Sequence, residues 1–237
     1  MSGIKRLLSA VLAGMLAFSL AACGAKQPPS SALPSEAPSA PVSAAPSSSQ
    51  TENVQTSESN ILIVYFTADE NREVDAVTSA SLTTVDGVEK GRVRAVADMI
   101  QVETGGTLFS IQTDVGYSSD GAELINFAAN EQNQSARPRL TTSVENLDDY
   151  DTIFVGYPNW WADLPMVMYS FFDEYDLSGK TVIPFCVHNG SRFSRTIQTI
   201  QELEPGANVI TDGFTVSERT VADAAADVAE WLRGLGF

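Results

Sequence analysis

Two adjacent aromatic residues, Trp160 and Trp161, follow a short apolar run and stand in the segment from 157 to 165. Large aromatic side chains are costly to leave in water, so each needs a core pocket or a flat apolar partner. A flat aromatic ligand satisfies this need, because stacking and the burial of apolar area both favour the contact. The alternative is that the tryptophans only cap the edge of a sheet, and we expect at least one of them to do so.

A second candidate segment, from 187 to 192, is polar and contains the only histidine of the chain, His188. Gly190 permits a tight turn and close approach of the backbone to a ligand. Backbone N–H groups of this segment could therefore bond the carbonyl edge of a ring such as isoalloxazine. His188 is a further candidate donor, and the alternative is that it is only structural.

The small number of histidine and cysteine residues limits which metal sites and nucleophilic sites the chain can form. One histidine excludes a site that needs two imidazoles, and two cysteines, Cys23 and Cys186, exclude a cysteine metal cluster. Cys186 closes an apolar run and is predicted to be a buried, inert thiol. We predict no metal site and no nucleophilic dyad.

The N-terminus has the pattern of an export signal. Lys5 and Arg6 precede an apolar run from 7 to 20, which is too short to span a membrane. The run ends in Leu-Ala-Ala-Cys-Gly, which resembles a bacterial lipobox, and this resemblance implies that Cys23 is acylated after removal of residues 1–22. Two or three acyl chains anchor a protein firmly. The alternative is an ordinary secretory signal that happens to end in cysteine.

The segment from 23 to 59 is rich in Pro, Ser and Ala and has no apolar period, so we predict a disordered tether. Residues 60–237 are then one folded domain, extracytoplasmic and attached to the membrane only through the lipid on Cys23. The chain has 30 acidic and 14 basic side chains, a net charge of −16. This charge argues against partners such as nucleic acid or anionic lipid.

The apolar pattern predicts five βα units. Strands are expected at 61–66, 107–111, 152–156, 181–186 and within 209–216, and helices at 92–102, 121–131, 166–172, 194–203 and 221–235. Strands that alternate with helices predict an α/β, doubly wound parallel sheet with helices on both faces. Ligands of such sheets bind beyond the carboxyl ends of the strands, so the loops after the first, third and fourth strands are the expected site.

Several segments resemble the flavodoxin-like family, which includes flavodoxins and FMN-dependent quinone reductases. They are the segments 146–161, 177–181 with 183–185, and 136–138, together with His188. The resemblance implies a five-stranded sheet of order 2-1-3-4-5 and FMN as a noncovalent cofactor. Residues 189–192 match the family's Gly-Gly-Ser-Gly only in part. The cofactor-binding residues implied or expected are Thr67, Ala68, Gly91, Arg92, Val93, Pro158, Asn159, Trp160, Trp161, His188, Asn189, Gly190 and Ser191.

The first loop departs most from the family. A phosphate loop is a short polar run whose N–H groups and hydroxyls cradle phosphate at a helix N-terminus. Here residues 72–90 look like an insertion, and the helix is expected to begin near Gly91. Asp69 and Glu70 would repel a phosphate if they point inward. Arg92 is either a phosphate donor or a solvated surface charge.

The leading hypothesis is an FMN-binding redox protein that transfers electrons or hydride through the flavin at the extracytoplasmic membrane surface. Its electron donor and acceptor are not encoded in any pattern of the sequence. The alternative is a cofactor-free lipoprotein that keeps the fold for binding, and the altered first loop favours it. A capture protein for small solutes would usually need two domains.

Overall fold

The structure is a computed structural model, and it describes residues 60–71, 82–118 and 120–237. The predicted signal peptide, the acylated Cys23 and the tether from 23 to 59 lie outside these residues. Within the described ranges, no helix is both long enough and apolar enough to cross a membrane.

The core of the fold is a parallel sheet. Its strands are β1 (Ile61–Tyr65), β4 (Thr107–Ser110), β5 (Thr152–Pro158) and β6 (Thr181–His188), in the order β4-β1-β5-β6. Two short strands, β7 (Asn208–Val209) and β8 (Phe214–Ser217), both pair with β6. The predicted order 2-1-3-4-5 is confirmed, but the fifth position is shared by two short strands, which makes the sheet six-stranded.

Pro184 gives a physical reason for this split. The carbonyl of Val182 accepts a hydrogen bond from Ile210, so the polar groups of Val182 face the outer strand. Alternate residues of a strand face the same neighbour, and Pro184 therefore faces that side without an N–H to donate. The ladder to the outer strand is interrupted there and resumes at the pair Phe185 and Phe214.

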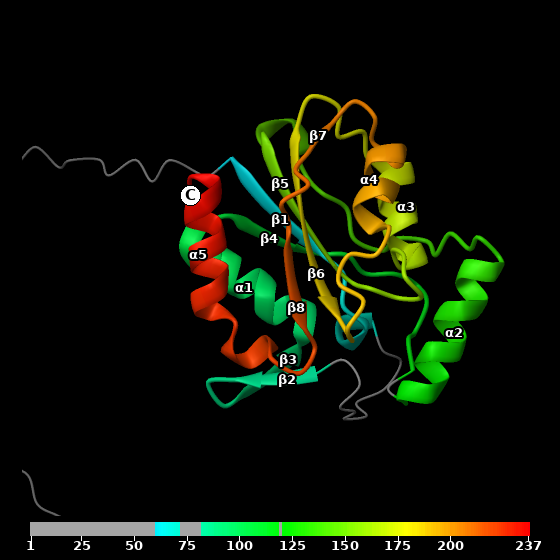
Figure 1. Cartoon of the computed structure of the whole chain (residues 1–237). Helices are drawn as coiled ribbons and strands as arrows, with labels where there is room; N and C mark the ends of the chain where they lie inside the picture. Colours follow the sequence, from blue (N-terminus) through cyan, green and yellow to red (C-terminus); the bar gives the residue numbers. More distant parts are fainter. Residues whose placement is uncertain (1–59, 72–81, 119) are drawn as a thin grey trace, which may run out of the picture. The chain divides into compact units, whose positions relative to one another are not determined.

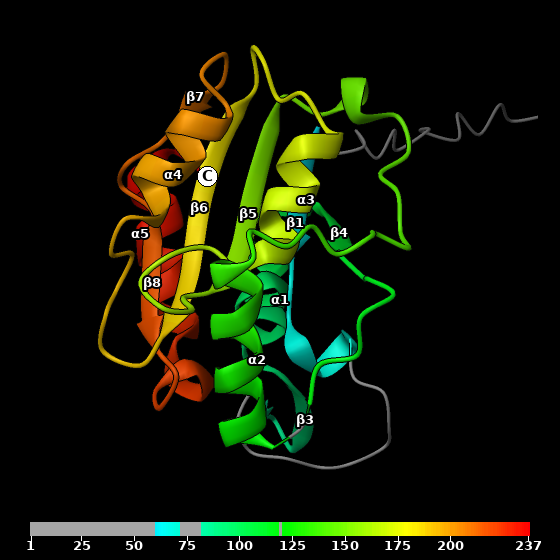
Figure 2. The ribbon, with the colours of Figure 1, turned by 90° about the vertical axis from the view of Figure 1, so that its right-hand side faces the viewer.

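Helices cover both faces of the sheet, as predicted. Figure 2 shows α3 (Met166–Glu174) and α4 (Thr196–Leu203) in front of β5 and β6, with α1 (Arg92–Thr104) and α5 (Ala225–Leu235) behind them. The side chains of β1 alternate between the two layers: Val64 joins the core under α3, and Ile63 joins the core under α1 and α5. Helix α2 (Gly121–Asn133) lies beyond α3, toward the side where β1, β5 and β6 end (Figure 1). The 3-10 helices are η1 (Ala68–Asn71), η2 (Leu147–Asp149) and η3 (Val221–Asp223).

Part of the predicted loop insertion is a β-hairpin. Strands β2 (Leu82–Val85) and β3 (Val88–Gly91) pair antiparallel as a separate sheet. Asp86 and Gly87, with φ angles of 51° and 79°, form the two-residue turn between them. An Asp-Gly pair between β-branched residues is a strong hairpin signal, which our sequence prediction of a plain loop missed.

Candidate functional site

A pocket of about 230 Å³ lies at the carboxyl ends of β1, β5 and β6, bounded by the start of α1 and by α2. Ten of the thirteen predicted cofactor-binding residues line it, and the exceptions are Gly91, Gly190 and Ser191. Because these residues come from loops far apart in the sequence, the fold confirms that the three loops meet. The lining residues are Thr67, Ala68, Arg92, Val93, Leu124, Ile125, Ala128, Pro158, Asn159, Trp160, Trp161, Val187, His188, Asn189 and Glu218.

One end of the pocket is formed where the chain returns from the insertion. Gly91 lies so close to the buried Thr67 side chain that a Cβ at Gly91 would overlap Thr67 Oγ1. Helix α1 therefore starts beside the end of β1, although residues 68–90 intervene. Among the described residues, no side chain caps its first turn, and the turn contains no acidic residue. Its N–H groups and its positive dipole end are thus suited to an anion.

We predict that Gly91→Ala destabilises the protein by about 2 kcal/mol, because the added methyl group forces Thr67 or the start of α1 to move. Urea unfolding measures the change. Gly234→Ala is the matched control, since a Cβ there meets nothing within 4 Å on the exposed side of α5. The control should stabilise the protein by about 0.5–1 kcal/mol, and equal effects of the two variants would contradict the packing at Gly91.

The acidic residues of the first loop are not part of the pocket wall. Glu70 accepts a hydrogen bond from the Tyr65 hydroxyl at 3.1 Å and pairs with Arg94 at 3.4 Å. Asp69 and Glu70 both lie outside the lining. Repulsion of a phosphate would require these carboxylates to point inward, and neither residue lines the pocket.

A different carboxylate enters the pocket. Glu218 follows β8 and lies 3.4 Å from Arg92 Nη1, and both side chains line the pocket. A backbone hydrogen bond from Glu218 N to the carbonyl of His188 fixes this position. Sequence reasoning missed Glu218, although its place directly after the last strand was a signal, since ligands bind at the carboxyl ends of strands.

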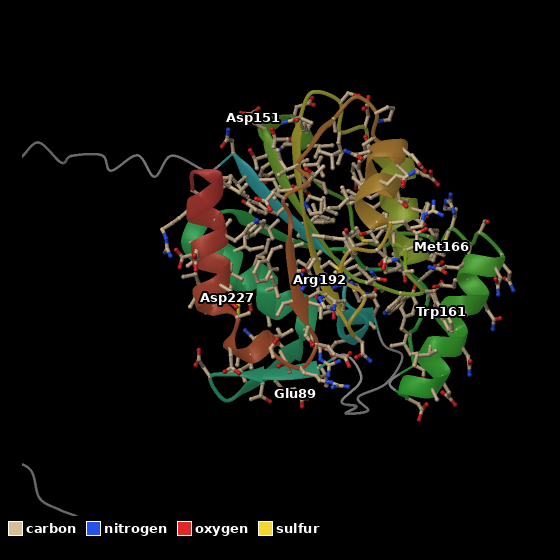
Figure 3. The ribbon with its side chains drawn as sticks, in the orientation of Figure 1. Glu89, Asp151, Trp161, Met166, Arg192 and Asp227 are labelled. Carbon is tan, nitrogen blue, oxygen red and sulfur yellow. The ribbon has the colours of Figure 1, made fainter. Side chains whose placement is uncertain are left out.

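The two tryptophans have different environments. Trp160 packs edge-on against Phe66 and near Tyr117, each at 5.6 Å between ring centroids, and so caps the sheet edge. Trp161 is 57% exposed, and its indole nitrogen donates to the carbonyl of Ile125 at 3.0 Å. Figure 3 shows Trp161 beside α2. Positive φ angles at Trp161 (53°) and Ala162 (64°) are uncommon for such residues and turn the chain sharply here. Only Trp161 therefore presents a largely exposed ring at the pocket.

The loop after β6 forms the other end of the pocket. His188 Nδ1 accepts a hydrogen bond from the backbone N–H of Gly190 at 2.9 Å, which leaves Nε2 as the donor of a neutral ring. Asn189 lines the pocket, whereas Gly190 and Ser191 are exposed next to it. The Asn159 side chain donates to the Arg192 carbonyl at 2.7 Å and so ties the loops after β5 and β6 together.

We predict that His188 titrates with a midpoint below 6.5. Burial lowers its pKa, the charge of Arg192 lowers it further, and Glu218 opposes them. The folded state thus binds this proton less readily than the unfolded chain, so the stability contribution of His188 is present above about pH 6.5 and is lost as pH falls through the folded-state pKa. Because the chain has one histidine, a proton NMR titration follows its ring signals without overlap. A midpoint at or above 6.5 would contradict the structure.

Helix α2 supplies a wall of the pocket that sequence reasoning did not include in the site. Leu124, Ile125 and Ala128 line the pocket, and Ile125 is 56% exposed. An apolar helix stripe looks the same in sequence whether it faces the sheet or a ligand. Gln132 holds this wall in place, because its side-chain amide donates to the Trp160 carbonyl at 2.8 Å.

The other reactive groups are not part of this site. Cys186 is 1% exposed, and burial raises the pKa of its thiol far above the ordinary range, in agreement with the predicted inert thiol. In the described ranges, no cluster of three or more His, Cys, Asp or Glu side chains could hold a metal ion.

The sequence profile of the flavodoxin family matches residues 61–234, almost the whole described domain. The chain belongs to the flavodoxin family. The strand order and the pocket at the carboxyl ends of β1, β5 and β6 agree with this membership.

Two solved structures from Bacteroides species give the same result for the fold. A Bacteroides eggerthii protein described as a flavoprotein is 25% identical, with a TM-score of 0.53, and the match covers 71% of this chain and 97% of that one. A similar protein from Bacteroides uniformis is 25% identical with a TM-score of 0.54, covering 73% and 97%. A flavoprotein from Lactobacillus acidophilus, solved in complex with FMN, is 18% identical with a TM-score of 0.49, covering 70% and 97%. No curated protein matches this chain.

Proposed function

We propose that this flavodoxin-family protein binds FMN in the pocket between α1, α2 and the loops after β5 and β6, and acts as a redox protein. One observation carries the proposal: a half-exposed tryptophan ring and an uncapped helix N-terminus with an arginine lie in the same pocket. A ring with a phosphorylated side chain needs both features, one for the apolar part and one for the anion.

The residues of the chain divide this task between them. Thr67, the first N–H groups of α1 and Arg92 would hold the phosphate. Trp161 would cover one face of the ring, while α2 limits its contact with water. His188 Nε2 and the backbone of Asn189 would bond its polar edge. Bound FMN supplies the electron or hydride chemistry, and the protein supplies binding, orientation and electrostatics.

The proposal includes the place of action. The lipobox pattern that ends at Cys23 and the Pro/Ser/Ala-rich segment after it favour a domain tethered by lipid outside the cytoplasmic membrane. The membrane is then contacted through the anchor only, and the electron donor and acceptor are extracytoplasmic molecules of the bilayer or its surroundings.

A second candidate function, a cofactor-free binding protein, is favoured by the ion pair of Arg92 and Glu218. This pair places a carboxylate where a phosphate would lie, and Arg92 already has an anionic partner. If the pair stays closed, the pocket accepts an uncharged ligand more readily than FMN.

Titration of the full chain with FMN distinguishes the FMN-binding function from the cofactor-free function. We expect saturable quenching of flavin fluorescence, because the flavin ring stacks on Trp161. We also expect a shifted, structured absorption band in the visible range, because the ring moves from water into the pocket. The circular dichroism spectrum shows whether the same sample is folded. A folded chain that leaves FMN fluorescence unchanged would overturn the proposal in favour of the cofactor-free function.

A further inference from the structure

A second cavity, of about 600 Å³, lies on the other side of α2. It shares no lining residue with the FMN pocket. One wall is the α2 face that carries Phe127, Asn130, Glu131 and Gln134, which are three, four and seven residues apart and so lie on one side of the helix. The opposite wall consists of Asp114 and Val115 together with residues 136–139.

Glu131 is the unusual group of this cavity. The residue belongs to the wall of the cavity, yet it is only 6% exposed. Its hydrogen-bond partner among the described residues is the hydroxyl of Tyr117, at 3.2 Å. A hydroxyl carries no positive charge, so a carboxylate here is buried without an ionic partner. Burial accordingly raises the pKa of Glu131 to about 7, although the Tyr117 hydrogen bond opposes the shift.

The cations near Glu131 are engaged elsewhere. Arg139 forms an ion pair with Asp114 at 3.0 Å. Arg137 pairs with Asp173 and lies over the ring of Tyr169, with 5.0 Å between its guanidinium carbon and the ring centroid. Each guanidinium of the cavity therefore already has a carboxylate. Glu131 is the one acid of the cavity that lacks a cation among the described residues.

A buried carboxylate without a cation is unfavourable, and a cation that enters the cavity removes this penalty. Phe127, 39% exposed, offers an aromatic face for an apolar group and for a positive charge. The amide oxygens of Asn130 and Gln134 are further acceptors for an N–H donor. We propose that this cavity binds a small organic ammonium ion, with its nitrogen against Glu131 and its apolar part against Phe127.

The proposal is tested by titrating the full chain with 2-phenylethylamine, whose ammonium group and ring match the two walls, and following the heat of binding. We expect saturable binding at pH 8 with or without FMN, and an affinity that falls about tenfold for each pH unit below about 7, since Glu131 must then lose a proton. The charged groups that share the cavity are Asp114, Arg137 and Arg139, and Tyr117 faces Glu131. The neutral analogue 2-phenylethanol should bind at least tenfold more weakly.

Glu131→Gln should reduce the affinity for 2-phenylethylamine at least tenfold and abolish its pH dependence, while keeping an acceptor for the Tyr117 hydroxyl. Glu123→Gln removes the same charge from the same helix outside the cavity and should leave the affinity within twofold. Phe127→Ala tests the other wall without touching the carboxylate, and we expect a severalfold loss. Equal affinity for the amine and the alcohol, or equal effects of the two glutamate variants, would overturn the proposal. Absence of binding at pH 8 would overturn it as well, whatever the outcome of the FMN titration.

Discussion

Reversing the charge of Arg92, in the variant Arg92→Glu, is expected to weaken FMN binding about 100-fold and riboflavin binding less than about threefold. Hydrogen bonds between an arginine and a phosphate are charge-assisted and contribute about 1.5–3 kcal/mol, and the reversed charge adds repulsion. Riboflavin has the same ring but no phosphate, so the ratio of the two affinities isolates the phosphate contact. Fluorescence titration with both ligands measures it.

Two further variants make this test specific. Arg233→Glu produces the same change of net charge in α5 without touching the pocket, and its FMN affinity should stay within about twofold, because water and salt screen an exposed charge that makes no contact with the ligand. Glu218→Gln should tighten FMN binding several-fold, since it releases Arg92 from a competing carboxylate. If Arg92→Glu weakens both flavins equally, Arg92 does not hold the phosphate.

Trp161→Ala is expected to weaken both FMN and riboflavin about 30-fold, or about 2 kcal/mol, because the variant removes the ring that covers the flavin. The free energy of unfolding should change by less than about 0.5 kcal/mol, since Trp161 is 57% exposed and leaves no large cavity behind. Flavin titration and urea unfolding of the same preparation measure the two quantities.

Trp160→Ala should show the opposite pattern. This side chain is partly buried and packs against the core residues Phe66 and Tyr117, so its removal should destabilise the protein by about 3 kcal/mol. Any loss of flavin affinity would then accompany a loss of stability. Unchanged flavin affinity in the stable Trp161→Ala variant would show that the exposed ring does not contact the ligand.

The fold was largely predictable from the sequence, because parallel strands buried on both faces read as continuous apolar runs. The strand order also follows from the family resemblance. The division of the last strand was not predicted, since it depends on which neighbour Pro184 faces, and that is a property of the strand register. The hairpin at residues 82–91 was missed for a different reason, because its Asp86-Gly87 signal stood inside a segment interpreted as a loop.

The site was predictable at the level of loops and less so at the level of side chains. Trp160 and Trp161 both line the pocket, but no sequence pattern distinguishes the one that packs against the core from the one that stays exposed. Glu218 contacts Arg92, which lies 126 positions earlier in the sequence, and only the folded sheet brings the two together. Long-range pairs of this kind depend on tertiary structure, which local periodicity does not encode.

The close approach of Gly91 to Thr67 has a consequence for how this protein can vary. Thr67 and Gly91 are in contact although residues 68–90 separate them in the sequence, so the start of α1 is fixed directly against the end of β1. The entropy of closing such a loop grows only slowly with its length, by about 0.6 kcal/mol for each doubling. Changes of length between Asn71, which is hydrogen-bonded to Thr67, Ile111 and Thr113, and the hairpin that starts at Leu82 are therefore expected to leave the start of α1 in place. The position of α1 at this end of the pocket is in this sense set by its contact with the end of β1 and not by the length of the segment before it.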